Sequence, residues 1–542
     1  MPIPFLVRGA TVIDGSGSDP AAADVSVGPD GRIEAIGPGI AVAESSTVVD
    51  ASGLVLCPGF IDMHSHSDLY TMVRPGSGQP PVGDGPKLLQ GCTAQVFGQD
   101  GISAAPVAED DVDGYAAYIA GLDGFLAPAR WTWRSFAEYL QRLRANSSTR
   151  IGALVGHSTV RRLVMGMAAR PPTTDELQAM SRAVDQAMAD GALGLSTGLV
   201  YAPASFASTD ELIALCRVVA ARGGRFFVHV RSESDRVVEA TQEVIEVARQ
   251  TGVHLHYSHI KAAGRRNWHL AGRLIELIDQ ARDDGLQISS DIHPYTAGST
   301  TASVLLPPWV MADGVGTALQ RLGDPSVRLR IRDQLMHDTT GWDNWWAFSD
   351  RWDGLVVAGA HRPGIAGHSL ASVIASAGVN DPLSPAAFDV VFDLLTEEQL
   401  SMSIVSFNNT EDNVGQFLSQ PHCTVGSDAL VNPHGHPHPR LYGTFPRILG
   451  RYVREQGVLS LPEAIGAMTG RAASALGRTD LGLLTAGAMG DLVLLDPDTV
   501  ADRATYEEPR LAPVGIKRVW VAGRPVVEDG GFVSTIGAAA NA

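Results

Sequence analysis

The chain has 542 residues, of which 45% are hydrophobic and 18% charged, and its formal net charge is -18. This is the composition of a globular protein with enough apolar side chains for a sizeable core. The acidic balance argues against nucleic acid and anionic membranes as partners.

The cysteines and the lack of long apolar runs indicate in which cellular compartment the protein is expected. The cysteines show no CxxC spacing and do not look like a disulfide framework: Cys57, Cys92, Cys216 and Cys423. The N-terminus lacks the basic and apolar regions of a signal peptide, and no run of about 18 apolar residues predicts a membrane span. We therefore expect a cytoplasmic protein with no membrane partner.

The two ends of the chain have similar patterns. Residues 1–58 contain short β-branched runs separated by Gly, Pro and Asp turn signals, and residues 481–542 have the same character. Neither end is long enough to bury a core alone. We expect one small β-sandwich built from both termini, with residues 59–480 inserted into it.

The middle of the chain, residues 59–480, alternates strand and helix patterns. Helical patterns lie at 176–191, 209–224, 236–252 and 269–285, and the last three end in glycine, a usual helix stop. Eight strands with helices between them favour an α/β fold, a (β/α)8 TIM-type barrel, over an open doubly wound sheet. The expected strands are Gly59–His64, Thr93–Phe97, Ile151–Val155, Ala192–Ser196, Phe226–His229, Leu255–His259, Leu286–Ser290 and Cys423–Gly426.

One stretch, from about residue 299 to 360, interrupts the alternation. It contains TASVLLPPWV and the Trp-rich run WDNWWAFSDRWDG, and it is too long for a simple loop. We expect an insertion after the seventh strand. It either covers the mouth of the barrel or is a peripheral packing element, and the sequence favours neither.

The first strand of the middle region, in GFIDMHSHSD at 59–68, leads into His64 and His66. Alternate residues of a strand face the same side, so the two imidazoles point the same way and suit a chelating pair. The alternative is a chance pair of surface histidines. The buried apolar run before the pair and the aspartate after it argue for a metal.

Two further histidines, His229 and His259, close apolar runs that precede polar loops. In a barrel such strand ends gather at one face, where active sites lie. A lone strand-end histidine is more often structural, but this many together indicate a metal. His254 and His256 compete in the sixth strand, and their shared face points away from the mouth.

The last strand ends in Asp428, within CTVGSDALV. An aspartate at this strand end can bind a metal and take a proton from water. The alternative is a helix N-cap, because aspartate also serves there. We expect Asp428 to be both a metal ligand and the general base and acid.

These motifs resemble the amidohydrolase superfamily, and most closely its N-acyl-D-amino-acid deacylase (D-aminoacylase) family. The resemblance rests on GFIDMHSHSD, GLSTGLVYAP, HVRSESD, SHIKAAG, SSDIHPYTAGST, SDALV with HPHPRLYGTFPR, and GAMGDLVLLDP. It covers nearly the whole chain, and the HPRLYGTF and YTAGST runs are particular to the family. It implies a β-sandwich with a (β/α)8 barrel, zinc, and hydrolytic removal of an acyl group from a D-amino acid.

One position departs from the family pattern. D-aminoacylases have a cysteine ligand in a Gly-Asn-Cys-Gly run, where this chain has Gly-Gln-Asp-Gly with Asp100. Other superfamily members use a carboxylated lysine, but Lys87 lies in a helical stretch and Lys261 is better placed to contact substrate. Asp100 is therefore our candidate bridging ligand, with a turn cap as the alternative. A carboxylate suits Zn²⁺ and also harder metals such as Mn²⁺.

The predicted ligands divide into two positions for one or two metal ions. We expect Asp100, His229 and His259 to form the tighter position. His64, His66 and Asp428 form a second or weaker one, and we expect one occupied position to be enough for activity, as in similar enzymes. Zn²⁺ is the expected ion, with Mn²⁺ or another divalent metal as alternatives.

Four further residues are candidates for substrate binding. Arg440 suits a substrate carboxylate, because guanidinium binds carboxylate with two hydrogen bonds. Lys261 and Tyr295 are candidate hydrogen-bond partners of the substrate. His157, after the third strand, is either a mouth residue or structural, and Arg440 by itself could be a plain surface residue.

The leading hypothesis is a metal-dependent hydrolase of a linear amide in a small molecule, deacylating N-acyl-D-amino acids. A second keeps the metal chemistry on a cyclic amide or imide, a D-residue dipeptide or a non-natural amide. A third is a metal-free scaffold of the same fold, which the retained ligand set disfavours.

Overall fold

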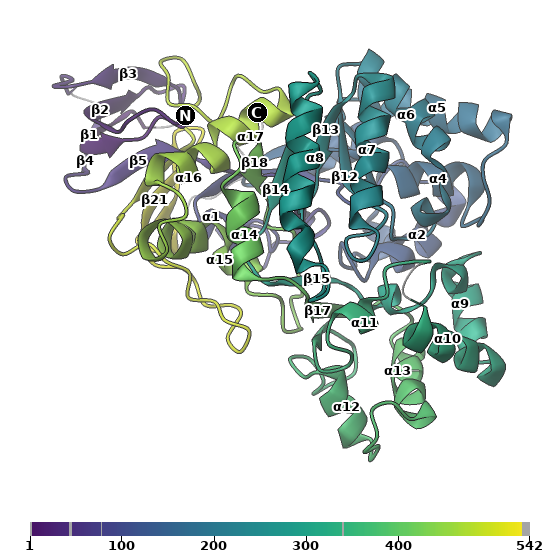
Figure 1. Cartoon of the computed structure of the whole chain (residues 1–542). Helices are drawn as coiled ribbons and strands as arrows, with labels where there is room; N and C mark the ends of the chain where they lie inside the picture. Colours follow the sequence, from purple (N-terminus) through teal and green to yellow (C-terminus); the bar gives the residue numbers. More distant parts are fainter. Residues whose placement is uncertain (1–2, 43–45, 77, 339–340, 534–542) are drawn as a thin grey trace.

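The computed structural model describes residues 3–42, 46–76, 78–338 and 341–533, and the fold is mixed α/β (Figure 1). The expected C-terminal unit extends to residue 542, so its last residues lie outside the described part. No helix in the described ranges is long and apolar enough to cross a membrane.

Strands from both ends of the chain share one nine-stranded sheet, in the order β23-β22-β21-β20-β5-β1-β2-β3, with β4 paired to β1. The two ends meet where β5 pairs antiparallel with β20, and Leu56 lies opposite Leu494. Val7, Val25 and Trp520, from three of its strands, are buried in the apolar core of this sheet. The strands are β1 (Phe5–Val12), β2 (Ala21–Val27), β3 (Ile33–Gly37), β4 (Thr47–Asp50), β5 (Val55–Pro58), β20 (Leu492–Leu495), β21 (Ile516–Val521), β22 (Arg524–Glu528) and β23 (Gly531–Phe532).

The middle of the chain supplies parallel strands in two main sheets, β6-β8-β9 and β10-β11-β12-β13-β14-β18. A short parallel pair, β7-β19, lies just beyond. Each expected strand has an observed counterpart, although β11 and β14 lie two residues later than expected. The strands are β6 (Phe60–Asp62), β7 (Ser65–His66), β8 (Cys92–Phe97), β9 (Arg150–Ala153), β10 (Val155–Gly156), β11 (Gly194–Gly198), β12 (Arg225–His229), β13 (His254–Tyr257), β14 (Ile288–Ile292), β18 (Cys423–Val425) and β19 (Ala429–Leu430).

Backbone hydrogen bonds continue from one parallel sheet to the other at both of their edges. At one edge, Leu193 N donates to Ala153 O at 2.8 Å, which joins β9 to β11. At the other edge, Met63 N donates to Val425 O at 3.2 Å, next to β6 and β18. The first and last strands of the middle region are therefore neighbours.

Helices connect these parallel strands, because a parallel connection needs a crossover. The expected helices are observed as α5 (Thr174–Ala189), α6 (Thr209–Ala221), α7 (Val237–Thr251) and α8 (Ala271–Asp283). A capping box between Thr173 and Glu176 starts α5. Gly252, with φ 71°, ends α7 in the left-handed conformation that glycine adopts without a Cβ clash.

Between β14 and β18 the chain leaves the parallel strands and builds a separate unit, seen at the lower right of Figure 1. Its antiparallel sheet has the order β15-β17-β16, so it reaches beyond residue 360 to Phe407. Trp346, Trp352 and Phe388 are buried in its own apolar core. The elements are β15 (Ala297–Thr301), α9 (Val315–Leu322), α10 (Pro325–His337), α11 (Trp345–Phe348), β16 (Leu355–Gly359), α12 (Leu370–Ser376), α13 (Pro385–Glu397) and β17 (Ser403–Phe407).

Candidate metal centre

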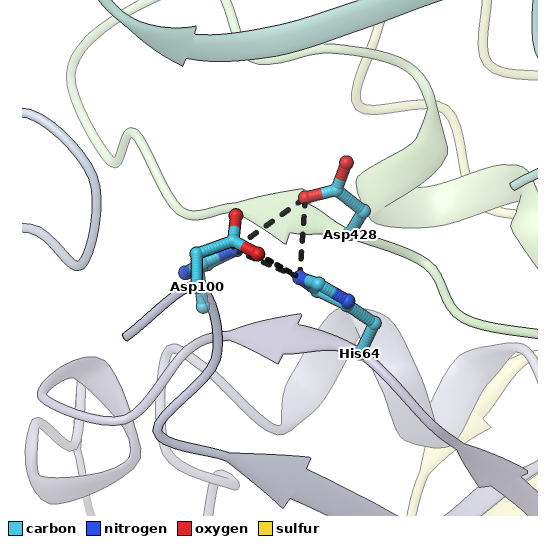
Figure 2. A group of neighbouring side chains, drawn as sticks. His64, Asp100 and Asp428 are labelled. Atoms are coloured by element: carbon cyan, nitrogen blue, oxygen red, sulfur yellow. Dashed lines mark hydrogen bonds and ion pairs between the residues drawn. The ribbon is translucent and has the colours of Figure 1, made fainter. Parts of the chain in front are cut away.

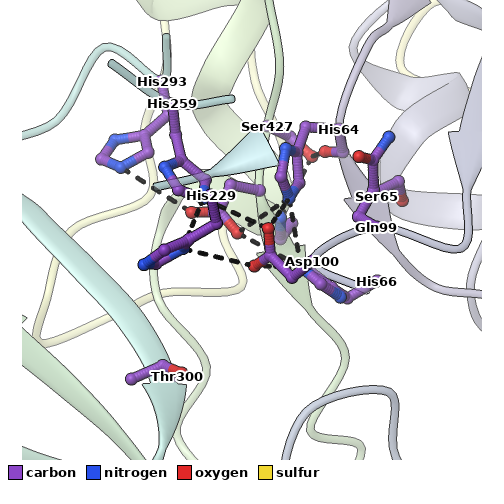
Figure 3. Close-up of polar contacts among 12 residues, drawn as sticks. His64, Ser65, His66, Gln99, Asp100, His229, His259, His293, Thr300 and Ser427 are labelled. Carbon is purple, nitrogen blue, oxygen red and sulfur yellow. Dashed lines mark hydrogen bonds and ion pairs between the residues drawn. The ribbon is translucent and has the colours of Figure 1, made fainter. Parts of the chain in front are cut away.

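The structure brings together all six side chains that the sequence suggested as metal ligands. They form two overlapping groups, in each of which the ligand atoms lie within 4.8 Å of one another. Every member is buried and lies at or just after a strand end (Figures 2 and 3). The first group is His64, His66, Asp100 and Asp428, and the second is Asp100, His229 and His259.

In the first group, the Nε2 atoms of His64 and His66 are 3.3 Å apart. Asp100 presents one carboxylate oxygen to each of these atoms, both at 3.6 Å. Asp428 Oδ1 lies 3.5 Å from His66 Nε2 and 3.8 Å from His64 Nε2. Four ligand-type side chains therefore converge on one small space.

In the second group, His229 Nδ1 lies 3.0 Å from His259 Nε2. Asp100 faces both rings, with Oδ1 at 3.4 Å from His259 Nε2 and Oδ2 at 3.8 Å from His229 Nδ1. Asp100 is thus the residue common to the two groups.

Three of the six residues have left-handed backbone conformations, namely Asp100 with φ 54°, His259 with φ 35° and Asp428 with φ 50°. This conformation is uncommon for residues with a Cβ, and such strain is often found at functional sites. Next to Asp100, a side chain on Gly98 would collide with the carbonyl oxygen of Leu154. The turn that presents Asp100 therefore needs glycine at that position.

The donor set fits a divalent metal ion. Burial opposes ionisation of Asp100, but nearby His64 and His259 outweigh it and hold the pKa of the carboxyl well below its usual range. Asp100 Oδ1 and His229 Nε2 are buried without a hydrogen-bond partner among the described residues. Buried polar groups this crowded cost free energy unless something binds them. Imidazole and carboxylate are ligands of Zn²⁺, and carboxylate also suits Mn²⁺.

Two carboxylates outside the expected set orient the histidine rings. Asp123 Oδ1 lies 2.8 Å from His66 Nδ1, and Glu233 Oε1 lies 3.0 Å from His259 Nδ1. A carboxylate on the far ring nitrogen fixes the tautomer of a metal-binding histidine. The sequence patterns predicted neither of them. Glu233 lies only four residues after His229 in HVRSESD, whereas Asp123 lies in a loop with no local signal.

The expected cationic residues lie beside the cluster. Arg440 is fully buried, and its Nη1 lies 2.8 Å from Asp428 Oδ2. Its Nη2 donates to Ser299 O at 2.9 Å. Lys261 Nζ donates to Glu233 Oε1 at 2.6 Å and lies 2.9 Å from His259 Nδ1.

Tyr295 lies farther out than the two cations. Its ring packs on the guanidinium of Arg447 at 4.7 Å and against the edge of His438 at 5.1 Å. His438 Nδ1 in turn accepts a hydrogen bond from Arg440 N. Tyr295 therefore contacts His438, and His438 in turn contacts Arg440.

His157 is fully buried and has partners at both ring nitrogens. Nδ1 pairs with Thr197 Oγ1 and Nε2 with Glu211 Oε1, each at 2.9 Å. Glu211 also forms an ion pair with Arg161. A substrate group could bind the His157 ring only by displacing one of these bonds.

Two residues set aside by the sequence analysis also have clear partners. Lys87, in α1 (Gly85–Leu89), is buried and donates to Asp62 Oδ2 at 2.7 Å. His256 pairs with Ser289 and with Asp291, both at 2.8 Å. Neither belongs to the two ligand groups in the described part of the chain.

His293 is a site residue that the sequence analysis missed. It follows β14 directly, it is 2% exposed, and its Nε2 lies 3.9 Å from Asp428 Oδ2 (Figure 3). Burial, then the charge of Arg440, lower its pKa well below the usual value, so the ring is neutral. The signal was available, since His293 is a further histidine at a strand end.

Comparison with known proteins shows to which family this chain belongs. The amidohydrolase family model matches residues 47–527. The chain belongs to the amidohydrolase family, which confirms the resemblance of its motifs.

Particular relatives resemble the whole chain. The D-aminoacylase of Alcaligenes xylosoxydans xylosoxydans is 36% identical over 535 residues, which cover 98% of this chain and 96% of that protein. The N-acyl-D-glutamate deacylase of Bordetella bronchiseptica, solved with zinc and a phosphonate inhibitor, matches with a TM-score of 0.80, 34% identity and 97% of each chain. A D-aminoacylase structure that concerns a binuclear metal centre matches with a TM-score of 0.80, 33% identity and 99% of each chain.

Proposed function

We propose that this chain is a metal-dependent deacylase that hydrolyses N-acyl-D-amino acids to a carboxylate and a D-amino acid. The observation that carries the proposal is the pairing of a buried ligand cluster with a buried arginine, Arg440, 2.8 Å from Asp428. The ligand cluster suits an amide carbonyl, because a metal ion held there would polarise it. The arginine suits the free carboxylate of the same substrate, because guanidinium binds carboxylate. Full-length similarity to D-aminoacylase and to N-acyl-D-glutamate deacylase supports this substrate class.

The proposal includes the architecture that holds the site. The parallel strands close into a (β/α)8 barrel formed by residues 59–480, and residues 1–58 and 481–542 form a small β-sandwich domain. The hydrogen bond from Met63 to Val425, between the first and last strands, supports closure. Polar site residues at the carboxyl ends of several strands are typical of such barrels.

In this proposal, Asp100, His229 and His259 hold a tighter metal ion, and His64, His66 and Asp428 hold a second or weaker one. Zn²⁺ is the proposed ion, with Mn²⁺ as an alternative. When bound, such an ion lowers the pKa of water toward about 7 and polarises the amide carbonyl.

Asp428 is the proposed general base and acid. Its Oδ1 faces the histidines of the cluster, and its Oδ2 faces Arg440. A carboxylate in this position can accept a proton from the attacking water and deliver it to the leaving amide nitrogen. Its buried setting keeps bulk water from competing for that proton.

Arg440 and Lys261 are proposed to bind the substrate carboxylate. In the structure Arg440 has Asp428 as its partner, so a substrate carboxylate competes with Asp428 for the guanidinium. Arg440 Nε is buried without a hydrogen-bond partner in the described ranges, which leaves a donor for the incoming group. Tyr295 and His157 remain secondary candidates for substrate contact.

An uncharged pocket beside the cluster is proposed to hold an uncharged group of the substrate. Tyr201 lies between the two, with its ring centroid 5.4 Å from that of His229. The pocket wall includes Leu306 and Met311 from the inserted unit and Ile102 and Leu122 from the other side. No charged side chain lies among its described lining residues. Substrates with an uncharged side chain are therefore expected to react faster than acidic ones.

A hydrolysis screen tests the proposal. Protein loaded with Zn²⁺ or Mn²⁺ is assayed against N-acetyl-D- and N-acetyl-L-amino acids, dipeptides with a D-residue and cyclic imides. We expect turnover of N-acetyl-D-amino acids, with N-acetyl-D-leucine or N-acetyl-D-methionine favoured over N-acetyl-D-glutamate. Exclusive turnover of cyclic imides or L-substrates would contradict the deacylase proposal. Protein without bound transition metal and without activity after metal addition would indicate a scaffold.

A further inference from the structure

His293 differs from the other buried histidines that lie outside the ligand groups. His157, His256, His422 and His438 each have a hydrogen-bond partner at one or both ring nitrogens. Neither ring nitrogen of His293 has one within the described part of the chain. An imidazole that only filled space would leave a buried donor and a buried acceptor unpaired, which costs about 1–3 kcal/mol per group. His293 therefore needs a partner from outside the protein.

The surroundings of His293 show where that partner binds. Its Nε2 lies 3.9 Å from Asp428 Oδ2, which is too long for a hydrogen bond. The same oxygen of Asp428 pairs with Arg440 at 2.8 Å, whereas the other oxygen faces His64 and His66. His293 thus lies on the substrate side of Asp428, next to the position where the amide must react. In Figure 3 the His293 side chain lies beside the ligand side chains, next to His259.

His293 is not a member of either ligand group. Its ring atoms do not join either set of converging ligand atoms within the described residues. Arg440, which is buried nearby and positively charged, would further disfavour a cation at that point. The chemistry left for the ring is a hydrogen bond to the bound substrate.

We propose that His293 is a catalytic residue whose ring N–H donates a hydrogen bond to the substrate carbonyl oxygen as that oxygen gains negative charge. The inference rests on the proposed amide hydrolysis and names a further group that acts in it. A donor fixed in a buried site is worth more to the developing oxyanion than to the neutral carbonyl. No proton leaves the ring, so Asp428 keeps the proton transfers.

The test compares His293→Phe and His293→Gln with the parent enzyme, each loaded with zinc. Phenylalanine keeps the ring volume without a donor, and glutamine restores an N–H near the position of Nε2. We expect His293→Phe to lower kcat by about 10²–10³-fold, the effect of removing one oxyanion donor, with KM changed by less than about threefold. His293→Gln should recover at least about tenfold of the loss. The affinity for a phosphonate analogue of the substrate should fall in parallel with kcat, while affinity for the product D-amino acid should not.

Two measurements separate this role from others. Zinc per chain, by elemental analysis, should equal that of the parent enzyme, and lower zinc would overturn the proposal by making His293 a ligand. His254→Gln is the matched control, because His254 lies at the opposite end of the neighbouring strand β13 and pairs with Ser289. Its kinetics should match the parent. Unchanged kcat in His293→Phe would also overturn the proposal.

The outcome for His293 is distinguishable from the outcome for the proposed function. If the parent enzyme hydrolyses a cyclic imide instead of N-acyl-D-amino acids, the deacylase proposal fails. His293→Phe must then still lose kcat on the imide, because the carbonyl oxygen of any amide develops the same charge. Full kcat on that substrate would reject the role of His293 separately.

Discussion

Asp100 is the side chain on which both halves of the ligand cluster depend. It belongs to both ligand groups, and its left-handed backbone is held between Gly98 and Gly101. The sequence could predict it only through the resemblance to the D-aminoacylase family, because Asp100 stands where that family has a cysteine ligand. A carboxylate at this position makes the proposed site more tolerant of hard metals than a thiolate would.

The first prediction concerns the metal preference set by Asp100. Asp100→Ala should lose tightly bound metal, and activity with it, because it removes the ligand shared by both groups. Asp100→Cys should keep zinc but bind manganese at least about tenfold more weakly than the parent, because thiolate favours softer ions. Elemental analysis after equilibration with equal free Zn²⁺ and Mn²⁺ gives the ratio. An Asp100→Ala protein that retains the parent metal content would contradict the bridging role.

The residues that the sequence did not predict share a physical cause. The run before His293, Ser289-Ser290-Asp291, is polar, so the strand was expected to end at Ser290. These side chains are nevertheless buried, and they pair with His256 and His422. Asp123 contacts His66 from 57 positions away. The periodicity of apolar residues predicts which residues lie on a strand. It does not predict which residue of a distant loop contacts that strand.

At the scale of elements, the inserted unit is tied to the loop that follows β12. Asp343, beside the Trp-rich helix α11, accepts hydrogen bonds from Ser232 Oγ and Ser234 Oγ at 2.6 Å each. It also accepts from Glu233 N at 2.7 Å. Glu233 in turn contacts His259 and Lys261. The insertion therefore positions a carboxylate of the site as well as lining the neighbouring pocket.

The second prediction follows from this contact. Asp343→Ala leaves three donors without their acceptor, each at a cost of about 1–3 kcal/mol if water cannot replace it. We expect faster amide hydrogen exchange in the 232–234 loop, lower zinc affinity and reduced kcat, with the far-UV circular dichroism unchanged. Asp353→Ala, a nearby exposed aspartate, is the control. Unchanged exchange in the loop would argue against this coupling.

The extent of the inserted unit was harder to predict than its existence. TASVLLPPWV and the tryptophans mark its start, but β15 pairs with β17, about a hundred positions later in the chain. Short antiparallel strands separated by helices carry no signal of which strand pairs with which. The parallel strands were easier, because most are apolar runs and several are followed by a regular amphipathic helix.

At the scale of the whole molecule, buried neutral histidines link stability to pH. Burial is the largest cause that lowers the pKa of His254 to about 4, and the same holds for His422. In the unfolded chain a histidine titrates near 6.5. Between these values the unfolded state binds protons that the folded state does not, so falling pH favours unfolding.

The third prediction is the resulting pH profile. The stabilising effect of these two neutral rings is fully present above about pH 6.5 and is lost as pH falls toward about 4. The free energy of unfolding from urea titrations should therefore decrease across this window. His254→Gln, which cannot titrate, should show a shallower decrease than the parent. Equal slopes for the two proteins would mean that His254 is accessible to protons in the folded state.

The shared terminal sheet has a consequence for how the chain acquires its structure. β5 and β20 pair directly although more than four hundred residues separate them. Closing so long a loop costs conformational entropy and slows folding, and strands that await a distant partner expose an unpaired edge. During synthesis, β1 to β5 leave the ribosome long before β20 exists. The sheet can be completed only at the end of translation, so β5, made early, is among the last strands to gain its second neighbour.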